Sequence, residues 1–185
     1  MMIEPTTPRL PAIEELNRLP REAFAEALKP LFEVAPPLAA GLFDRRPYRS
    51  YEELLDRAQA VIEGLTEEQR VEVINAHPRI GERPDALRQR SALSYREQGY
   101  GQALPGQEES EQVYRELEEL NRAYEERFGF RFVVFVNRRP KSAIVEVLKR
   151  RMQRPRDEEM ATALAEMLAI ARDRLRRLGV ENPEL

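Results

Sequence analysis

Apolar residues return every three or four positions along most of this chain, which is the spacing of helices that bury one face. In the first half, this spacing predicts helical segments at residues 12–19, 21–31, 38–43, 51–63 and 67–75. Ser50 and Thr66 precede two of these segments, with Glu53 and Gln69 three residues later in the spacing of a capping box. Prolines and glycines separate the segments, as expected of connections between helices.

The second half continues the helical pattern in longer runs. The longest covers residues 108–128, whose apolar positions share one face: Val113, Leu117, Leu120, Tyr124 and Phe128. Pro140 begins a helix that we expect to reach Met152, and Asp157 is the expected cap of a last helix over residues 158–178. Ser94 and Glu97 also have capping-box spacing and could begin one more helix.

One segment, residues 130–136, lacks the helical period and consists of aromatic and β-branched residues apart from Arg131, so we expect it to be extended. No second strand-like run is available to pair with it. Its backbone must therefore find hydrogen bonds elsewhere, either on a ligand or as a buried connector, unless it is a short helix. The predicted fold is all-α: a single-domain bundle of seven to eight helices over residues 12–179, with an N-terminal arm at 1–11 and a tail at 180–185.

Composition excludes several classes of function. The chain has 185 residues with 30 basic and 33 acidic side chains, a balance that argues against nucleic-acid binding. Because it has no cysteine and one histidine, disulfides, thiolate sites and histidine-rich zinc sites are excluded within one chain. No apolar run approaches the roughly 20 residues that span a bilayer, so no membrane partner is expected. The absence of cysteine suits a cytoplasmic protein.

The sole histidine, His77, lies at the end of a predicted helix, in the sequence Asn-Ala-His-Pro-Arg-Ile-Gly-Glu. Pro78 disfavours helical backbone angles at His77, and Gly81 permits a tight turn. Histidine is the side chain that most often transfers protons near neutral pH. The segment therefore offers either a catalytic imidazole or an ordinary surface histidine at a helix end.

Several motifs together resemble the 2-oxo-4-hydroxy-4-carboxy-5-ureidoimidazoline decarboxylase family of urate degradation. The segment His-Pro-Arg-Ile-Gly at 77–81 resembles its His-Pro-x-x-Gly motif, and Ser-Tyr-Arg-Glu-Gln at 94–98 resembles its Ser-x-x-Glu-Gln motif. Residues 127–133 resemble its Arg-Phe-Gly-Phe-x-Phe-Val signature, although Arg131 stands where proline is frequent. The motifs occur in the family's order and cover residues 13–178.

The resemblance implies an enzyme that converts this ureidoimidazoline to (S)-allantoin and carbon dioxide, acting as a homodimer without metal or cofactor. No nucleotide-binding or metal-binding motif occurs in the chain. The resemblance assigns catalysis to His77 and Glu97. It assigns substrate binding to Pro78, Ser94, Gln98, Val133, Val134, Phe135 and Arg174. Arg172 lies two residues from Arg174, so either arginine could be the one that binds.

Other interpretations stay open on the residues alone. Glu97 could serve only as part of a helix cap, and Arg174 could be solvated like most arginines in a charged helix. The chain could be a paralogue acting on a related ureide. It could also be a non-enzymatic helical module that binds a partner helix through the 108–128 face, in which case that apolar face should be exposed.

Overall fold

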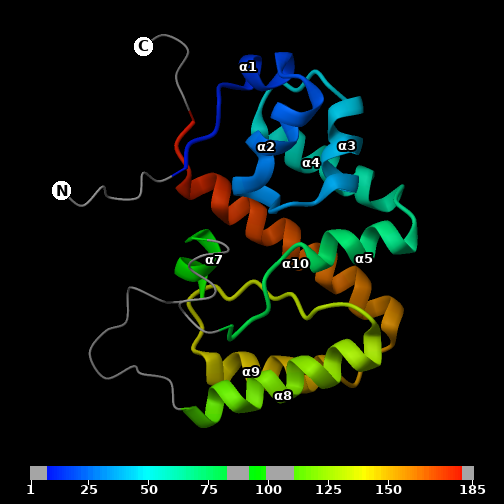
Figure 1. Ribbon diagram of the computed structural model, residues 1–185, viewed down its shortest axis with the longest axis vertical. Helices are drawn as coiled ribbons and strands as arrows, with labels where there is room; N and C mark the ends of the chain where they lie inside the picture. The colour runs from blue at the N-terminus through cyan, green and yellow to red at the C-terminus, as the bar shows by residue number, and fades with distance from the viewer. Residues whose placement is uncertain (1–7, 83–91, 99–110, 181–185) are drawn as a thin grey trace, which may run out of the picture. The chain divides into compact units, whose positions relative to one another are not determined.

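The computed structural model describes residues 8–82, 92–98 and 111–180. These residues form helices and no strand, which confirms the all-α prediction. The helices are labelled in Figure 1: α1 (Ile13–Arg18), α2 (Arg21–Phe32), α3 (Pro36–Asp44), α4 (Tyr51–Glu63), α5 (Glu67–Asn75), α7 (Ala92–Glu97), α8 (Glu111–Phe128), α9 (Lys141–Arg151) and α10 (Arg156–Arg177). None of the described helices combines the length and the apolar character needed to cross a membrane.

The chain divides into two compact units. Unit 1 consists of Met1–Ala76 and Leu168–Leu185, and unit 2 consists of His77–Met167. Helix α10 belongs to unit 2 as far as Met167 and to unit 1 from Leu168 onward. The histidine motif, α7, α8, α9 and the segment at 130–136 all lie in unit 2.

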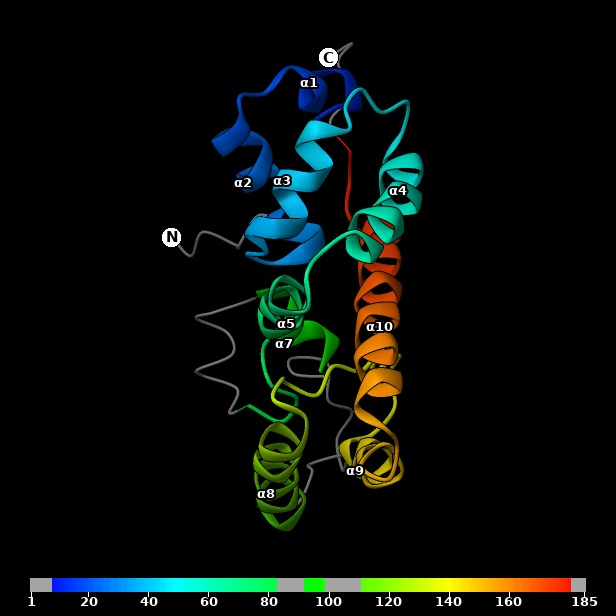
Figure 2. The same ribbon diagram turned by 90° about the vertical axis from the view of Figure 1, so that its right-hand side faces the viewer.

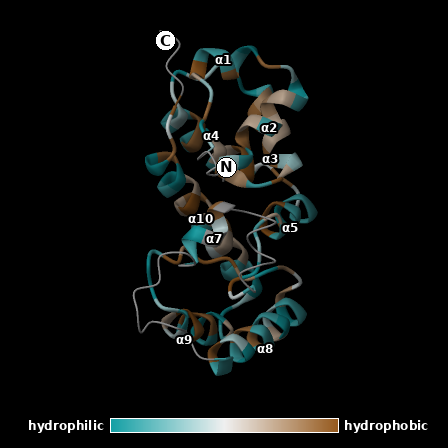
Figure 3. Ribbon diagram, turned by 60° about the vertical axis from the view of Figure 1, so that its left-hand side comes forward, coloured by the Kyte–Doolittle hydropathy of each residue, from teal (hydrophilic) through white to brown (hydrophobic). Residues whose placement is uncertain are grey.

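In unit 1, helix α3 packs against α2, α4 and α5. The apolar faces predicted from the sequence are buried there, and Figure 3 shows the apolar colour along α2 and α3. Leu16, Phe24, Leu38, Leu42 and Leu54 are fully enclosed. Leu10 is enclosed as well, and its N–H donates to Gly179 O, so the packed structure extends into the segment predicted to be an N-terminal arm.

Of the four side-chain caps predicted from the sequence, two are correct and two are wrong. Thr66 and Gln69 form the complete capping box at the start of α5. Ser50 accepts a hydrogen bond from Glu53 N–H, but the Glu53 carboxylate accepts from Arg49 N–H instead of returning to Ser50. Ser94 is inside α7, which begins at Ala92, so it is no N-cap. Asp157 is likewise inside α10, because the helix begins one residue earlier; there its negative charge favours the helix N-terminus.

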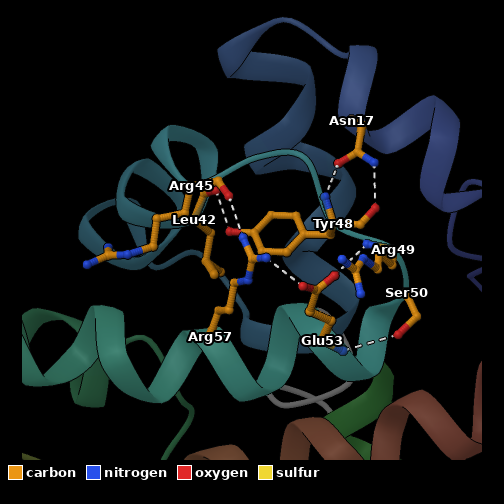
Figure 4. Close-up of polar contacts among 8 residues, drawn as sticks. All are labelled: Asn17, Leu42, Arg45, Tyr48, Arg49, Ser50, Glu53 and Arg57. Carbon is orange, nitrogen blue, oxygen red and sulfur yellow. Dashed lines mark hydrogen bonds and ion pairs between the residues drawn. The ribbon is translucent and has the colours of Figure 1, made fainter.

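Tyr48 links the connection between α3 and α4 to the rest of unit 1 (Figure 4). Its hydroxyl donates to Leu42 O over 2.6 Å, and its main-chain N–H and O both bond to the Asn17 amide. Burial raises the pKa of Tyr48 to about 12, against the opposing effect of nearby arginines. Across α4, Glu53 pairs with Arg57, and hydrogen bonding from Arg49 N–H is the main reason that the pKa of Glu53 is lowered.

In unit 2, helices α8 and α9 pack side by side, as Figures 1 and 2 show. On the apolar face of α8, Leu117, Tyr124 and Phe128 are buried, whereas Val113 and Leu120 are half-buried. The face continues into an aromatic cluster made by Tyr124, Phe128, Phe130 and Phe132. Residues 130–136 are neither helix nor strand, which confirms the predicted interruption of the helical pattern. Tyr124 and Phe132 meet edge to face, with ring centroids 5.3 Å apart, so the end of α8 anchors this segment.

Candidate active site

His77 is buried, with 3% of its surface exposed, so the interpretation as an ordinary surface histidine is wrong. It follows the end of α5 and begins a turn at residues 77–81 that has no helical or sheet hydrogen bonding of its own. Pro78, the next residue in the sequence, is also buried. Gly81 has a φ of 75°, and a Cβ there would lie 2.9 Å from Leu117 Cδ1 on α8. The glycine therefore permits both the turn and its close approach to α8.

Gln98, just after α7, holds this turn with both ends of its side-chain amide. Its Oε1 accepts from Gly81 N–H over 2.9 Å, and its Nε2 donates to Arg79 O over 3.2 Å. The amide retains a second hydrogen and a second lone pair. The structure thus brings the Ser-x-x-Glu-Gln motif to the His-Pro-x-x-Gly motif through Gln98 itself.

Two further side chains bind the carbonyls of the same turn. Asn121 of α8 donates from Nδ2 to Ile80 O over 2.9 Å, and Arg131 donates from Nη1 to His77 O over 3.0 Å. The Arg79 side chain forms a bidentate pair with Glu125, at 2.6 and 2.9 Å, and this hydrogen bonding is the main reason that the pKa of Arg79 is raised. The backbone around His77 is therefore fixed by side chains from several parts of unit 2.

Helix α7 carries the remaining candidates from its motif. Ser94 is buried and Glu97 is half-buried. At the end of this helix Gln98 N–H donates to Ser94 O, and the buried Lys141 ammonium donates to Gln98 O over 2.9 Å. Lys141 also lies 5.6 Å from the centre of the Tyr114 ring. A cation at the carbonyl end of α7 opposes the partial negative charge there and stabilises the helix that carries Ser94 and Glu97.

The segment at 130–136 obtains several backbone hydrogen bonds from side chains. Val133 O accepts from Arg151 Nη1 over 2.7 Å, Phe135 N–H donates to Glu166, and Phe135 O accepts from Arg139 Nη2 over 2.6 Å. Among the hydrogen bonds within the described ranges, none uses the main chain of Val134, which is buried. Protein side chains thus support this segment on either side of Val134 and leave the polar groups of that residue available.

A buried ionic network lies behind Val133. Glu159 is fully enclosed and accepts from Arg151 Nε over 2.9 Å and from the Tyr124 hydroxyl over 2.5 Å. Burial, together with the hydrogen bond to Glu159, raises the pKa of Tyr124. Arg151 therefore connects the buried carboxylate to the carbonyl of a candidate binding residue.

Arg174 lies in unit 1, where it is 1% exposed and donates from Nη2 to Glu33 over 2.9 Å. The expectation that it is solvated is therefore wrong. Arg172 is more exposed and pairs with Asp56 over 3.0 Å. Burial distinguishes the two arginines and favours Arg174 as the one with a specific role.

Sequence reasoning missed the supporting residues, among them Asn121, Arg131, Lys141, Arg151 and Glu159. Asn121 was visible as the polar residue within the apolar stripe of α8, but its partner is 41 positions earlier in the chain. The described residues contain no group of three metal-ligating side chains close enough to hold an ion. The large exposed apolar residues of the described ranges are Val34 and Val180, neither of which belongs to α8, so the partner-helix interpretation is wrong.

Comparison with known proteins identifies the family. The sequence profile of the OHCU decarboxylase family, the 2-oxo-4-hydroxy-4-carboxy-5-ureidoimidazoline decarboxylases, matches residues 17–176, and the chain belongs to this family.

The chain is 31% identical over 163 residues to the decarboxylase of that name from Haloferax volcanii, covering 88% of this chain and 93% of the relative. It is 30% identical over 171 residues to the decarboxylase of that name from Bos taurus, covering 92% and 99%. A crystal structure of OHCU decarboxylase in the presence of (S)-allantoin shares the fold, with a TM-score of 0.60 and 21% identity over 80% of this chain and 92% of that one.

Proposed function

We propose that the protein decarboxylates 2-oxo-4-hydroxy-4-carboxy-5-ureidoimidazoline to (S)-allantoin and carbon dioxide in urate degradation. Membership of the family and the names of its relatives support the reaction. The observation that carries the proposal is the placement of His77. The chain's sole histidine is buried in a turn that Gln98, from the second motif of the family, holds by two hydrogen bonds.

The substrate provides its own electron sink. The bond between the ring carbon and its carboxylate breaks, carbon dioxide leaves, and the electron pair moves toward the adjacent ring imine. The imine nitrogen that receives the electron pair takes up a proton, the resulting enol loses its hydroxyl proton to form the carbonyl, and a proton adds to one face of the carbon that bears the ureido group. The reaction therefore consumes one proton overall. The enzyme must orient the carboxylate and manage these proton transfers, for which titratable side chains suffice.

His77 and Glu97 are the two groups proposed to handle these protons. The imidazole is held in a fixed turn and contacts the hydroxyl and carboxylate of the substrate, whereas Glu97 is half-buried on α7 and serves as the second proton-handling group. Two titratable groups in unlike surroundings can divide acid and base roles. Gln98 uses its second amide hydrogen for the ring, with Ser94 beside it in the same motif.

The backbone of residues 133–135 is proposed to bind the planar ureido group. Among these three residues, Val134 is the strongest candidate for a backbone hydrogen bond to the substrate. Protein side chains already bond to Val133 O and to both polar groups of Phe135. Pro78 lines the site next to His77, and Arg174 binds a carbonyl or carboxylate oxygen through its guanidinium. The resemblance further supports a cytoplasmic homodimer, which analytical ultracentrifugation tests.

The deciding experiment follows circular dichroism while urate oxidase and hydroxyisourate hydrolase generate the substrate in the cuvette. Spontaneous decay gives racemic allantoin and no final signal. Wild-type protein should produce the (S)-allantoin signal rapidly, and His77→Ala should abolish it while the protein stays folded. An unchanged trace with folded wild-type protein refutes this substrate and leaves the related-ureide interpretation.

A further inference from the structure

The turn at residues 77–81 is irregular. Its Arg79 carbonyl accepts one long backbone hydrogen bond, from Glu82 N–H over 3.4 Å, and side chains supply further donors to its carbonyls. Three of its carbonyls have identified donors: Arg131 for His77 O, Gln98 for Arg79 O and Asn121 for Ile80 O. Gln98 belongs to the proposed binding site. Asn121 and Arg131 lie outside the proposed catalytic and binding residues.

We infer that Asn121 and Arg131 are positioning residues that fix the His77 backbone for catalysis. The inference rests on the proposed function, since it concerns how the same histidine is placed. Neither side chain is required to touch the substrate. Each acts through a carbonyl of the turn, Arg131 on the histidine itself and Asn121 on the residue three positions further along.

The Asn121 contact is specific because of its burial and its chemistry. Asn121 is 4% exposed, and Ile80, whose carbonyl it binds, is buried as well. A carbonyl only accepts, so the amide must present its nitrogen to Ile80 O. Removing this donor leaves a buried carbonyl without its partner, and the turn must move to find another. Asn121 also stands one helical turn from Tyr124, so its own position is fixed by the buried end of α8.

Arg131 acts from a different element. It lies between Phe130 and Phe132, both of which are buried in the aromatic cluster, so the start of its side chain is anchored. Its guanidinium reaches 54 positions back along the chain to His77 O. The turn at residues 77–81 is thus tied to α8 through one carbonyl and to the segment at 130–136 through another.

Loss of either donor should displace the imidazole without removing it. Because a displacement of about 1 Å can lower a rate by roughly 100-fold, we expect kcat to fall by about 10- to 100-fold in Asn121→Leu and in Arg131→Met. KM should change by less than about 3-fold, since an interaction that affects mainly the transition state lowers kcat rather than ground-state binding. Arg131→Lys, which keeps a donor and a charge, should recover part of the lost rate.

The second readout is independent of turnover. Because His77 is the sole histidine, its ring C–H resonances can be followed in an NMR titration without overlap from another imidazole. Both variants should shift these resonances and move the midpoint of the titration. Glu126→Gln, at an exposed position of α8, is the control and should leave resonances, kcat and KM unchanged.

The outcomes separate the two proposals. Folded Asn121→Leu and Arg131→Met proteins with wild-type kcat and unchanged histidine resonances overturn the inference. So does a loss of thermal stability with no change in kcat, because that result shows a structural role alone. If Asn121→Leu does not fold, kcat and the histidine resonances of Arg131→Met decide whether the inference holds. If the wild-type protein does not decarboxylate this substrate, the proposed function fails, and the NMR titration still decides whether these donors position His77.

Discussion

Replacing Glu159 by glutamine removes the negative charge from the buried network behind Val133. The carboxylate is fully enclosed, and its partner Arg151 is 5% exposed at the side chain. Glutamine keeps the shape and one acceptor oxygen, but it leaves the Arg151 cation buried without a counter-charge. Removing one partner of a buried ion pair costs about 3–5 kcal/mol, so we expect a loss of that order in the free energy of unfolding.

The matched control is Glu158→Gln, the same chemical change at the preceding, exposed position of α10. It should alter the free energy of unfolding by no more than about 0.5 kcal/mol. Urea unfolding followed by circular dichroism at 25 °C measures both variants, provided that independent probes give coincident transitions. For a chain of this size, each kcal/mol lost from the free energy of unfolding lowers the melting temperature by about 2–4 °C. Glu159→Gln should therefore lower the melting temperature by roughly 6–20 °C.

A double variant tests whether the loss comes from the unpaired charge. Replacing Arg151 by methionine together with Glu159 by glutamine removes both charges, and should cost clearly less than the two single losses added together. The double variant still loses the bond to Val133 O, so it should not return to wild-type stability. A loss of less than about 1 kcal/mol in Glu159→Gln, or additive losses in the two single variants, would contradict a coupled buried ion pair.

Two further predictions concern unit 1. Because the pKa of Tyr48 is raised to about 12 in the folded protein, from about 10 in an unfolded chain, its neutral form stabilises the fold below pH 10 and this contribution is lost as the pH rises toward 12. Urea unfolding of Tyr48→Phe at several alkaline pH values should therefore show a weaker decline across this window than the wild-type protein, and an identical decline contradicts the assignment. Arg174→Met should raise KM by at least about 10-fold in the circular dichroism assay, as expected when a charged hydrogen bond to substrate is lost, whereas Arg172→Met, which breaks an exposed pair, should leave KM within about 2-fold. The opposite order would identify Arg172 as the binding arginine.

The sequence by itself determined the all-α class, most helix positions and the interruption at 130–136. These features depend on local patterns, namely apolar periodicity, prolines and glycines. The Thr66 capping box was predictable because all its bonds lie within four residues. The start of α10 was misplaced by a similar local argument, because an acidic residue is favourable both as a cap and within the first turn.

The tertiary structure decided how the candidate residues are supported. The spacing of His77 left open whether it is exposed or buried, since burial depends on elements distant in sequence. Arg131 and Asn121 bind its turn from 54 and 41 positions away, and Arg151 reaches back 18 positions to Val133 O. Hydrogen bonds of this kind leave no periodic trace, because any donor of suitable length brought near a carbonyl by the fold can make them. Local patterns therefore predicted the helices and the motifs, while packing determined which buried polar side chains hold the turn at residues 77–81 and the segment at 130–136 in place.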